Sequence, residues 1–305
     1  FNNMEMFNQK VLSQRIGRLK KSKALDELEQ VEGYCLRKCS ERFLETSYDV
    51  MAEEMPYFKT MGYTEFATNF YFQPLNSKLR GEQLMDAWDD NVKNPDDWSS
   101  YLVNNIQSKL ANKYEGRKEE IEKWPATDYL VVLPGSNKVK TNVCLNRLKA
   151  ISKKHGNNVY FKPHPITTHQ IIGELKDFFG ESNILPREVD MYYYLQKAKA
   201  VYTTHISESA IYAAVLGKRI EPIDTWNTLT AGSFESINKY LFTNQHHIKD
   251  YINKCFSSPK SGIVNPMVDK NWKEKVDKYM DYICEKRDVY KDWFIVQPKK
   301  KVVKK

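Results

Sequence analysis

The sequence lacks any long apolar run, and cysteine is scarce. No hydrophobic stretch approaches the roughly 20 residues that a helix needs to cross a bilayer, so we predict no transmembrane segment. Of the five cysteines, Cys35 and Cys39 stand one helical turn apart, without the second pair typical of a zinc site. Free thiols in a chain without a membrane segment lead us to expect a cytoplasmic protein.

Acidic residues are fewer than basic ones, and the metal-binding signatures built from them are missing. Residues 86–97 hold five aspartates, but they follow neither a calcium-loop nor a DxD pattern. We therefore predict no metal site, and we expect these aspartates to lie on the surface or to cap the helix near Trp98.

The excess of basic residues gives the chain a net charge of +8. This balance favours an anionic partner, which leaves nucleic acid, a phosphorylated small molecule, an acidic polysaccharide or a membrane face. Basic residues gather at 15–23 and in the tail 299–305. Each cluster is either a solvated surface or a contact with phosphates, and the sequence leaves both readings open.

Residues 129–226 alternate short apolar runs with amphipathic segments. The apolar runs lie at 129–133, 159–161, 183–186, 200–204 and 219–224, and helical periods separate them. This alternation predicts an α/β fold in which a parallel sheet has helices on both faces. Ligands of such sheets bind at the carboxyl ends of the strands, so the residues that follow each run are candidates for a site.

The flanking parts of the chain are mostly helical in pattern. Helical spacing covers residues 1–55, 98–123, 237–242, 248–256 and 272–290, and an aromatic run at 70–75 predicts a buried strand. We predict a helix-rich amino-terminal domain over 1–125 and an α/β domain that carries the parallel sheet over 126–260. A carboxyl-terminal helical segment over 261–298 that packs back and a basic tail over 299–305 complete the division.

Three polar motifs follow predicted strands. Pro134-Gly135-Ser136 precedes a helix, Lys162-Pro163-His164-Pro165 is stiffened by two prolines, and Thr204 to Ser209 lead into an Ala-rich helix that Ser207 is expected to cap. A tight turn or a helix cap explains each motif alone, but parallel strands bring them to one edge. We predict an anion site there, formed by Gly135, Ser136, Lys162, His164, Thr204, Ser207, Glu208 and Ser209.

The order of these motifs, strand-PGS, strand-KPHP and strand-TTxxSES-helix, resembles the donor-binding half of GT-B glycosyltransferases. The nearest likeness is to the group of capsule-polysaccharide enzymes, polysialyltransferases and teichoic-acid polymerases, and it covers roughly residues 128–226. It implies a GT-B-like fold with a Rossmann-type donor domain. It also implies that His164, Ser207 and Ser209 contact the phosphates of a nucleotide-sugar, and we expect His164 to be the catalytic residue. The missing DxD motif indicates metal independence, and we expect no other cofactor.

The chain departs from that group at several places. Tyr212 stands where many GT-B enzymes carry a ribose-binding glutamate, which leaves that contact to Glu208, to another group or to none. The serine motif reads Ser-Glu-Ser rather than paired serines. Residues 1–125 show no clear second Rossmann half, and no general base can be assigned there.

The resemblance implies sugar transfer from a nucleotide-sugar to an acceptor hydroxyl. The basic balance and a Lys-, Tyr- and Asn-rich composition favour a hydroxymethylated base in duplex phage DNA as the acceptor. A bacterial capsule or surface polysaccharide, or a lipid-linked glycan, is the alternative acceptor. A non-catalytic nucleotide- or nucleic-acid-binding protein on the same fold is the alternative of a different class.

Overall fold

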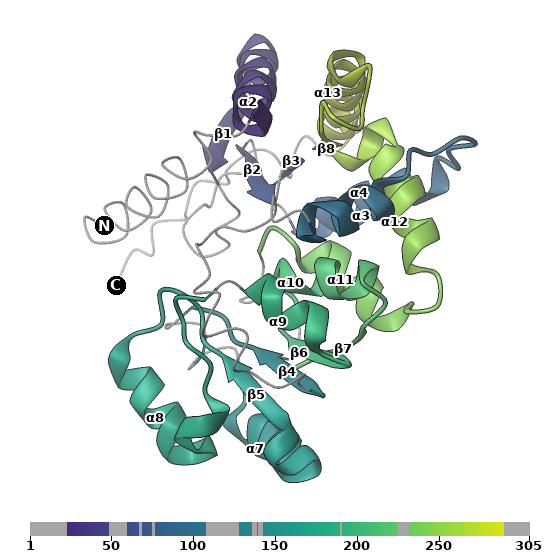
Figure 1. Cartoon of the computed structure of the whole chain (residues 1–305). Helices are drawn as coiled ribbons and strands as arrows, with labels where there is room; N and C mark the ends of the chain where they lie inside the picture. Colours follow the sequence, from purple (N-terminus) through teal and green to yellow (C-terminus); the bar gives the residue numbers. More distant parts are fainter. Residues whose placement is uncertain are drawn as a thin grey trace, which may run out of the picture.

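The protein is described by a computed structural model that covers residues 23–48, 60–66, 69–74, 77–107, 128–135, 139, 143–189, 191–224 and 232–289. Its strands form two four-stranded sheets, one parallel and one mixed. In Figure 1 the parallel sheet lies in the lower half and the mixed sheet in the upper half, with helices between them.

The parallel sheet has the strand order β5-β4-β6-β7. Its central strand β4 pairs with β5 on one side and with β6 on the other, so that Leu130 lies opposite both Tyr160 and Val201. The predicted α/β fold with a parallel sheet is thereby confirmed. The strands are β4 (Tyr129–Val132), β5 (Val159–Lys162), β6 (Ala200–Thr203) and β7 (Arg219–Pro222).

Helices cover both faces of this sheet because side chains alternate along each strand. Val131 points into a cluster with Leu148 and Leu175, whereas its neighbours Leu130 and Val132 belong to the cluster on the opposite face. The first face is covered by α7 (Leu145–His155) and α8 (His169–Phe179), and the second by α9 (Met191–Lys197) and α10 (Ser209–Val215). Short 3-10 turns follow two helices, η1 (Gly156–Asn158) and η2 (Glu181–Asn183).

One apolar run of this half is not a strand. Ile184 makes only an isolated bridge to Phe161, and the Leu185 N–H donates to the Phe161 carbonyl at 2.9 Å. The prediction of a strand at 183–186 is therefore wrong, because the run touches the edge of β5 at a single point before the chain turns.

The mixed sheet has the order β1-β2-β3-β8 and joins distant parts of the chain. The predicted buried aromatic strand is confirmed as β3, all of whose residues are buried. The prediction of helix throughout 1–55 is wrong at 42–48, where the chain turns and pairs in parallel with β2, and residues 1–22 and 49–55 lie outside the described residues. The elements of this region are α2 (Lys23–Glu41), β1 (Glu45–Tyr48), β2 (Thr60–Phe66), β3 (Asn69–Pro74), β8 (Ile263–Val264) and α13 (Trp272–Val289).

The last helix packs against the first described one. The Tyr34 hydroxyl of α2 donates to Asp277 of α13 at 2.8 Å, and Cys39 lies 3.9 Å from the Met280 sulfur. Both helices share a buried cluster with Phe70 and Phe72 of β3. α2 and α13 therefore cover the mixed sheet together, although they lie at opposite ends of the described chain.

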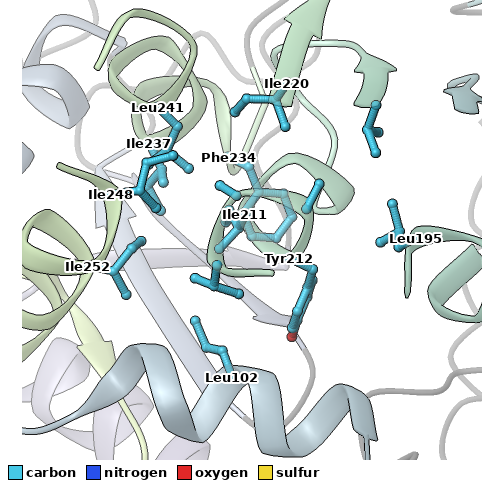
Figure 2. Close-up of a cluster of buried hydrophobic side chains, with 14 of the residues drawn as sticks. Leu102, Leu195, Ile211, Tyr212, Ile220, Phe234, Ile237, Leu241, Ile248 and Ile252 are labelled. Atoms are coloured by element: carbon cyan, nitrogen blue, oxygen red, sulfur yellow. The ribbon is translucent and has the colours of Figure 1, made fainter. Parts of the chain in front are cut away.

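Helices between the two sheets share one apolar core. Figure 2 shows Leu102 of α4, Ile211 of α10, Ile237 of α11 and Ile252 of α12, all fully buried in this core. The helices of this core beyond α9 and α10 are α3 (Ser77–Asp89), α4 (Trp98–Gln107), α11 (Glu235–Thr243) and α12 (Ile248–Ser257), and η4 (Pro259–Ser261) leads on to β8. The predicted domain limits stay predictions; α12, assigned to the second domain, packs on α3 and α4 of the first.

Candidate functional site

The strand order creates a switch point between β4 and β6. The chain leaves β4 to form β5 on one side and returns later to form β6 on the other side. In open α/β sheets, ligands bind at the carboxyl ends of strands at such a point. Because β5 and β6 both flank β4, their ends lie roughly 10 Å apart, which is about twice the strand spacing.

Gly135 and His164 lie against each other at this edge. A Cβ on Gly135 would come within 2.9 Å of the Ile166 Cδ1 atom and 4.0 Å of the His164 Nδ1 atom. The loop after β5 therefore approaches the loop after β4 as closely as a glycine permits. Ser136, predicted as part of the site, lies outside the described residues.

A backbone hydrogen bond determines which nitrogen of the neutral His164 ring carries the proton. The Ile166 N–H donates to His164 Nδ1 at 3.3 Å, so in the neutral ring the proton is carried by Nε2. The residue is half-buried. This arrangement suits donation of a hydrogen bond from Nε2 to an anionic oxygen.

Lys162 has a buried ammonium group. Its Nζ atom donates to the carbonyls of Pro163 at 2.7 Å and Arg187 at 3.0 Å, and the residue is 2% exposed. These bonds brace the His164 loop against the loop at 187. Direct contact between Lys162 and a ligand stays a prediction.

A chain of hydroxyl groups begins beside β4 and ends at Ser207. The Thr203 hydroxyl donates to the Val132 carbonyl at 3.4 Å and lies 3.1 Å from the Ser209 hydroxyl. The Ser209 hydroxyl in turn lies 2.5 Å from the Ser207 hydroxyl. Ser207 is half-buried and is the last of these hydroxyl groups. The sequence prediction places Ser207 as the cap of α10, but the capping position is Glu208, and Ser207 instead accepts the Ser209 N–H at 3.3 Å.

Glu208 and Thr204 contribute less accessible groups. The Tyr192 hydroxyl donates to Glu208 at 2.9 Å within the protein, and Tyr212 stacks edge-on against Tyr192. The Thr204 hydroxyl is buried and makes no hydrogen bond among the described residues. In this structure the described hydrogen bond of Glu208 is to the protein, so a ribose contact would require that bond to change.

A histidine–aspartate pair at the same edge is absent from the sequence predictions. His205 Nδ1 lies 2.8 Å from Asp224 Oδ1, and the His205 backbone N–H donates to both carboxylate oxygens at 3.1 and 3.2 Å. The Asn238 amide fixes the loop by donating to the carbonyls of His205 and Ser207, each at 2.7 Å. In the sequence, His205 follows the apolar run 200–204 and Asp224 ends the run 219–224, which could have marked both as candidates. Only the pairing of β6 with β7 shows that the two side chains meet.

Three of the five aspartates at 86–97 make structural contacts. Asp97 accepts the Ser100 N–H at 3.1 Å and so caps α4, as predicted, and hydrogen bonds from Ser100 lower the pKa of its carboxyl. Asp86 accepts the Tyr282 hydroxyl, and Asp90 accepts that of Ser258. Within the described residues, no group of three His, Cys, Asp or Glu side chains is arranged to hold a metal ion.

A scan against protein-family models and a search of curated proteins both found no match to this sequence. None of the described helices combines the length and the apolar character that crossing a bilayer requires.

Proposed function

We propose that the chain is a nucleotide-sugar-dependent glycosyltransferase of the GT-B type, with its donor phosphates bound at the β4–β6 switch point. The observation that carries the proposal is the placement of Gly135, His164 and Ser207 at the carboxyl ends of three adjacent parallel strands. Glycine permits close approach, the imidazole supplies an N–H, and the Ser207 hydroxyl ends a hydrogen-bonded chain. These are the groups that hold phosphate oxygens.

The proposed reaction forms a bond between the acceptor oxygen and the sugar C1 atom. The bond between C1 and the phosphate oxygen breaks, its electron pair stays on the departing nucleotide, and the acceptor proton passes to a base that is not assigned. His164 and Ser207 stabilise the charge that develops on the phosphate. We propose that this transfer is metal-independent, since such fixed donors serve the same purpose as a cation and the sequence has no DxD motif.

The acceptor that we favour is a hydroxymethylated base in duplex DNA. Among the described helices, α7 carries exposed cations and no carboxylate, with Arg147, Lys149, Lys153 and Lys154 on its surface. Such a surface suits a polyanion. A bacterial polysaccharide or a lipid-linked glycan is the second candidate acceptor.

A donor screen tests the proposal. Nucleotide-sugars are incubated with plain DNA, hydroxymethylated DNA and glycan acceptors, and mass spectrometry detects a sugar-sized adduct. We expect His164→Ala to lower turnover by roughly a hundredfold or more, because one preformed donor to developing charge is worth on the order of 3 kcal/mol. His246→Asn, a change at an exposed histidine in another loop, is the matched control.

Near-normal turnover of His164→Ala at saturating donor would remove His164 from the proposed chemistry. Binding of nucleotides without any transfer or hydrolysis would favour the other class, a non-catalytic nucleotide-binding protein. In that case the same edge of the sheet would still be the binding site.

A further inference from the structure

We propose that His205, oriented by Asp224, is a further phosphate-binding residue of this edge and donates from Nε2 to an oxygen of the nucleotide. This inference rests on the proposed function. It adds an imidazole on the β7 side of Ser207.

The pairing of β6 with β7 brings the two residues together. Thr203 lies opposite Pro222, and the Ile223 N–H donates to the Thr203 carbonyl at 2.9 Å, which extends the ladder by one bond. Immediately beyond this bond, His205 and Asp224 make the three contacts given above. Their position is therefore set by the sheet and does not depend on a loose loop.

The environment of Asp224 calls for an explanation. Its side chain is fully buried, and within the described residues all of its hydrogen bonds come from His205. Burying an ionised carboxylate costs several kcal/mol unless its oxygens are bonded. If residue 224 served only to link two loops, the amide of an asparagine could accept the same backbone hydrogen bond. A carboxylate that accepts a hydrogen bond from Nδ1 instead fixes the orientation of the imidazole and leaves Nε2 as its outward nitrogen.

The second ring nitrogen remains for a ligand. Within the described part of the chain, His205 Nε2 makes no hydrogen bond, although the side chain is only 11% exposed. The ring packs on Phe242, with centroids 4.9 Å apart and the ring planes at 66°, which keeps the imidazole in place. Because Asp224 accepts from Nδ1–H, Nε2–H donates to a phosphate oxygen in the imidazolium form of the ring, whose charge Asp224 then balances.

The same loop carries His205 and Ser207. The Asn238 amide holds the carbonyls of both residues, so their side chains are positioned before any ligand arrives. His205 and Ser207 are two residues apart in the sequence, and both follow the carboxyl end of β6. Groups fixed in this way lose little conformational freedom on binding, which favours affinity.

Two substitutions separate binding from a purely structural tie. His205→Asn keeps an amide N–H near the Nδ1 position and so keeps the bond to Asp224, but it lacks Nε2. His205→Gln places an amide N–H near the Nε2 position instead. The probes are UDP, GDP, ADP, CDP and CMP, with dissociation constants measured by calorimetry on the full chain.

We expect His205→Asn to weaken the best-bound probe by roughly tenfold or more, and His205→Gln to recover part of the loss. Unchanged affinity in His205→Asn would overturn the inference while leaving the proposed function standing, provided that His164→Ala weakens binding. Failure of the native chain to bind any probe would count against the proposed function itself.

Chemical footprinting provides a measurement that does not depend on the variants folding. Diethyl pyrocarbonate modifies accessible histidine nitrogens, and peptide mass spectrometry follows each residue with and without the best-bound nucleotide. We expect saturating nucleotide to slow modification of His205 and leave His246 unchanged. Protection of His164 with no protection of His205 would contradict the inference.

Discussion

Gly262 has a backbone conformation and a neighbour that leave no room for a side chain. Its φ is +69°, and a Cβ there would lie 1.9 Å from the Phe72 carbonyl oxygen, a backbone atom that cannot move away alone. The Phe72 N–H donates to the Gly262 carbonyl at 2.8 Å. We expect Gly262→Ala to lower the free energy of unfolding by about 2–4 kcal/mol.

Urea unfolding at neutral pH measures this loss, and Gly33→Ala is the control. Gly33 lies in α2 with nothing within 4 Å of its missing Cβ, so alanine there should be neutral or stabilising. Equal losses of stability in the two variants would show that a side chain at position 262 does not collide with the Phe72 carbonyl.

His155 makes stability depend on pH. It stacks on Tyr129 with centroids 3.4 Å apart and lies 2.9 Å from the Tyr202 hydroxyl. Desolvation, followed by Lys154 and Arg219, lowers its pKa below the usual 6.5. Above pH 6.5 the residue is neutral in the folded and unfolded chains. As pH falls below that value, the unfolded chain takes up the proton first and stability declines.

Unfolding free energies measured between about pH 7.5 and about pH 5.5 test this dependence. Replacing the titrating ring in His155→Gln should lower stability at pH 7.5 but flatten the pH dependence. The other histidines remain in both proteins, so the difference in slope isolates His155. A variant whose stability falls as steeply as that of the native chain would contradict the assignment.

A buried ion pair ties together two elements from opposite parts of the chain. Arg80 of α3 and Glu235 of α11 are 0% and 2% exposed, and Nη2 lies 2.5 Å from Oε1. Removing one partner leaves an uncompensated charge in the core. We therefore expect Arg80→Met to lower the free energy of unfolding by about 3–5 kcal/mol.

The double variant Arg80→Met with Glu235→Gln should recover part of that loss, since the remaining charge is removed too. The exposed pair Lys278–Glu274 is the control, and Lys278→Met should change stability by no more than about 1 kcal/mol. Equal losses at the two sites would mean that Arg80 is solvated in solution.

The sequence predicts the helices and strands whose pattern lies within their own residues. The parallel strands β4, β5 and β6 have apolar side chains toward both faces, so they appear as short runs between helical periods. β1 lacks this signal because Glu45 to Tyr48 are mostly polar, and β8 consists of Ile263 and Val264 alone. The site at Gly135, His164 and Ser207 could be predicted because each of these residues comes after a predicted strand. The contact between His205 and Asp224 could not, because it depends on β6 and β7 being neighbours in the sheet.

At the scale of the whole molecule, the net charge of +8 predicts how DNA binding should depend on salt. Each phosphate that is neutralised adds about 0.9 to the fall of log affinity with log salt. We expect tight duplex binding at low salt, a slope equal to several contacts, and little preference for sequence. Fluorescence anisotropy across a salt series provides the measurement.

The basic segments at 15–22 and 299–305 lie outside the described residues, so α7 offers the testable surface. Replacing Lys149, Lys153 and Lys154 by Gln should reduce the slope if α7 contacts DNA. A flat salt response of the native chain would favour a polysaccharide acceptor and would leave the donor site unaffected.

The way the chain closes the mixed sheet has a consequence for protein synthesis. All strands of the parallel sheet lie within residues 129–222, so that sheet is complete in a nascent chain soon after β7 emerges. β3 must wait for β8, because Phe70 pairs with Val264. At about 5–20 residues per second, the ribosome needs on the order of ten seconds or more to deliver this partner. During that interval the apolar edge of β3 is open to association with other chains, so early-made residues depend on late-made ones for protection.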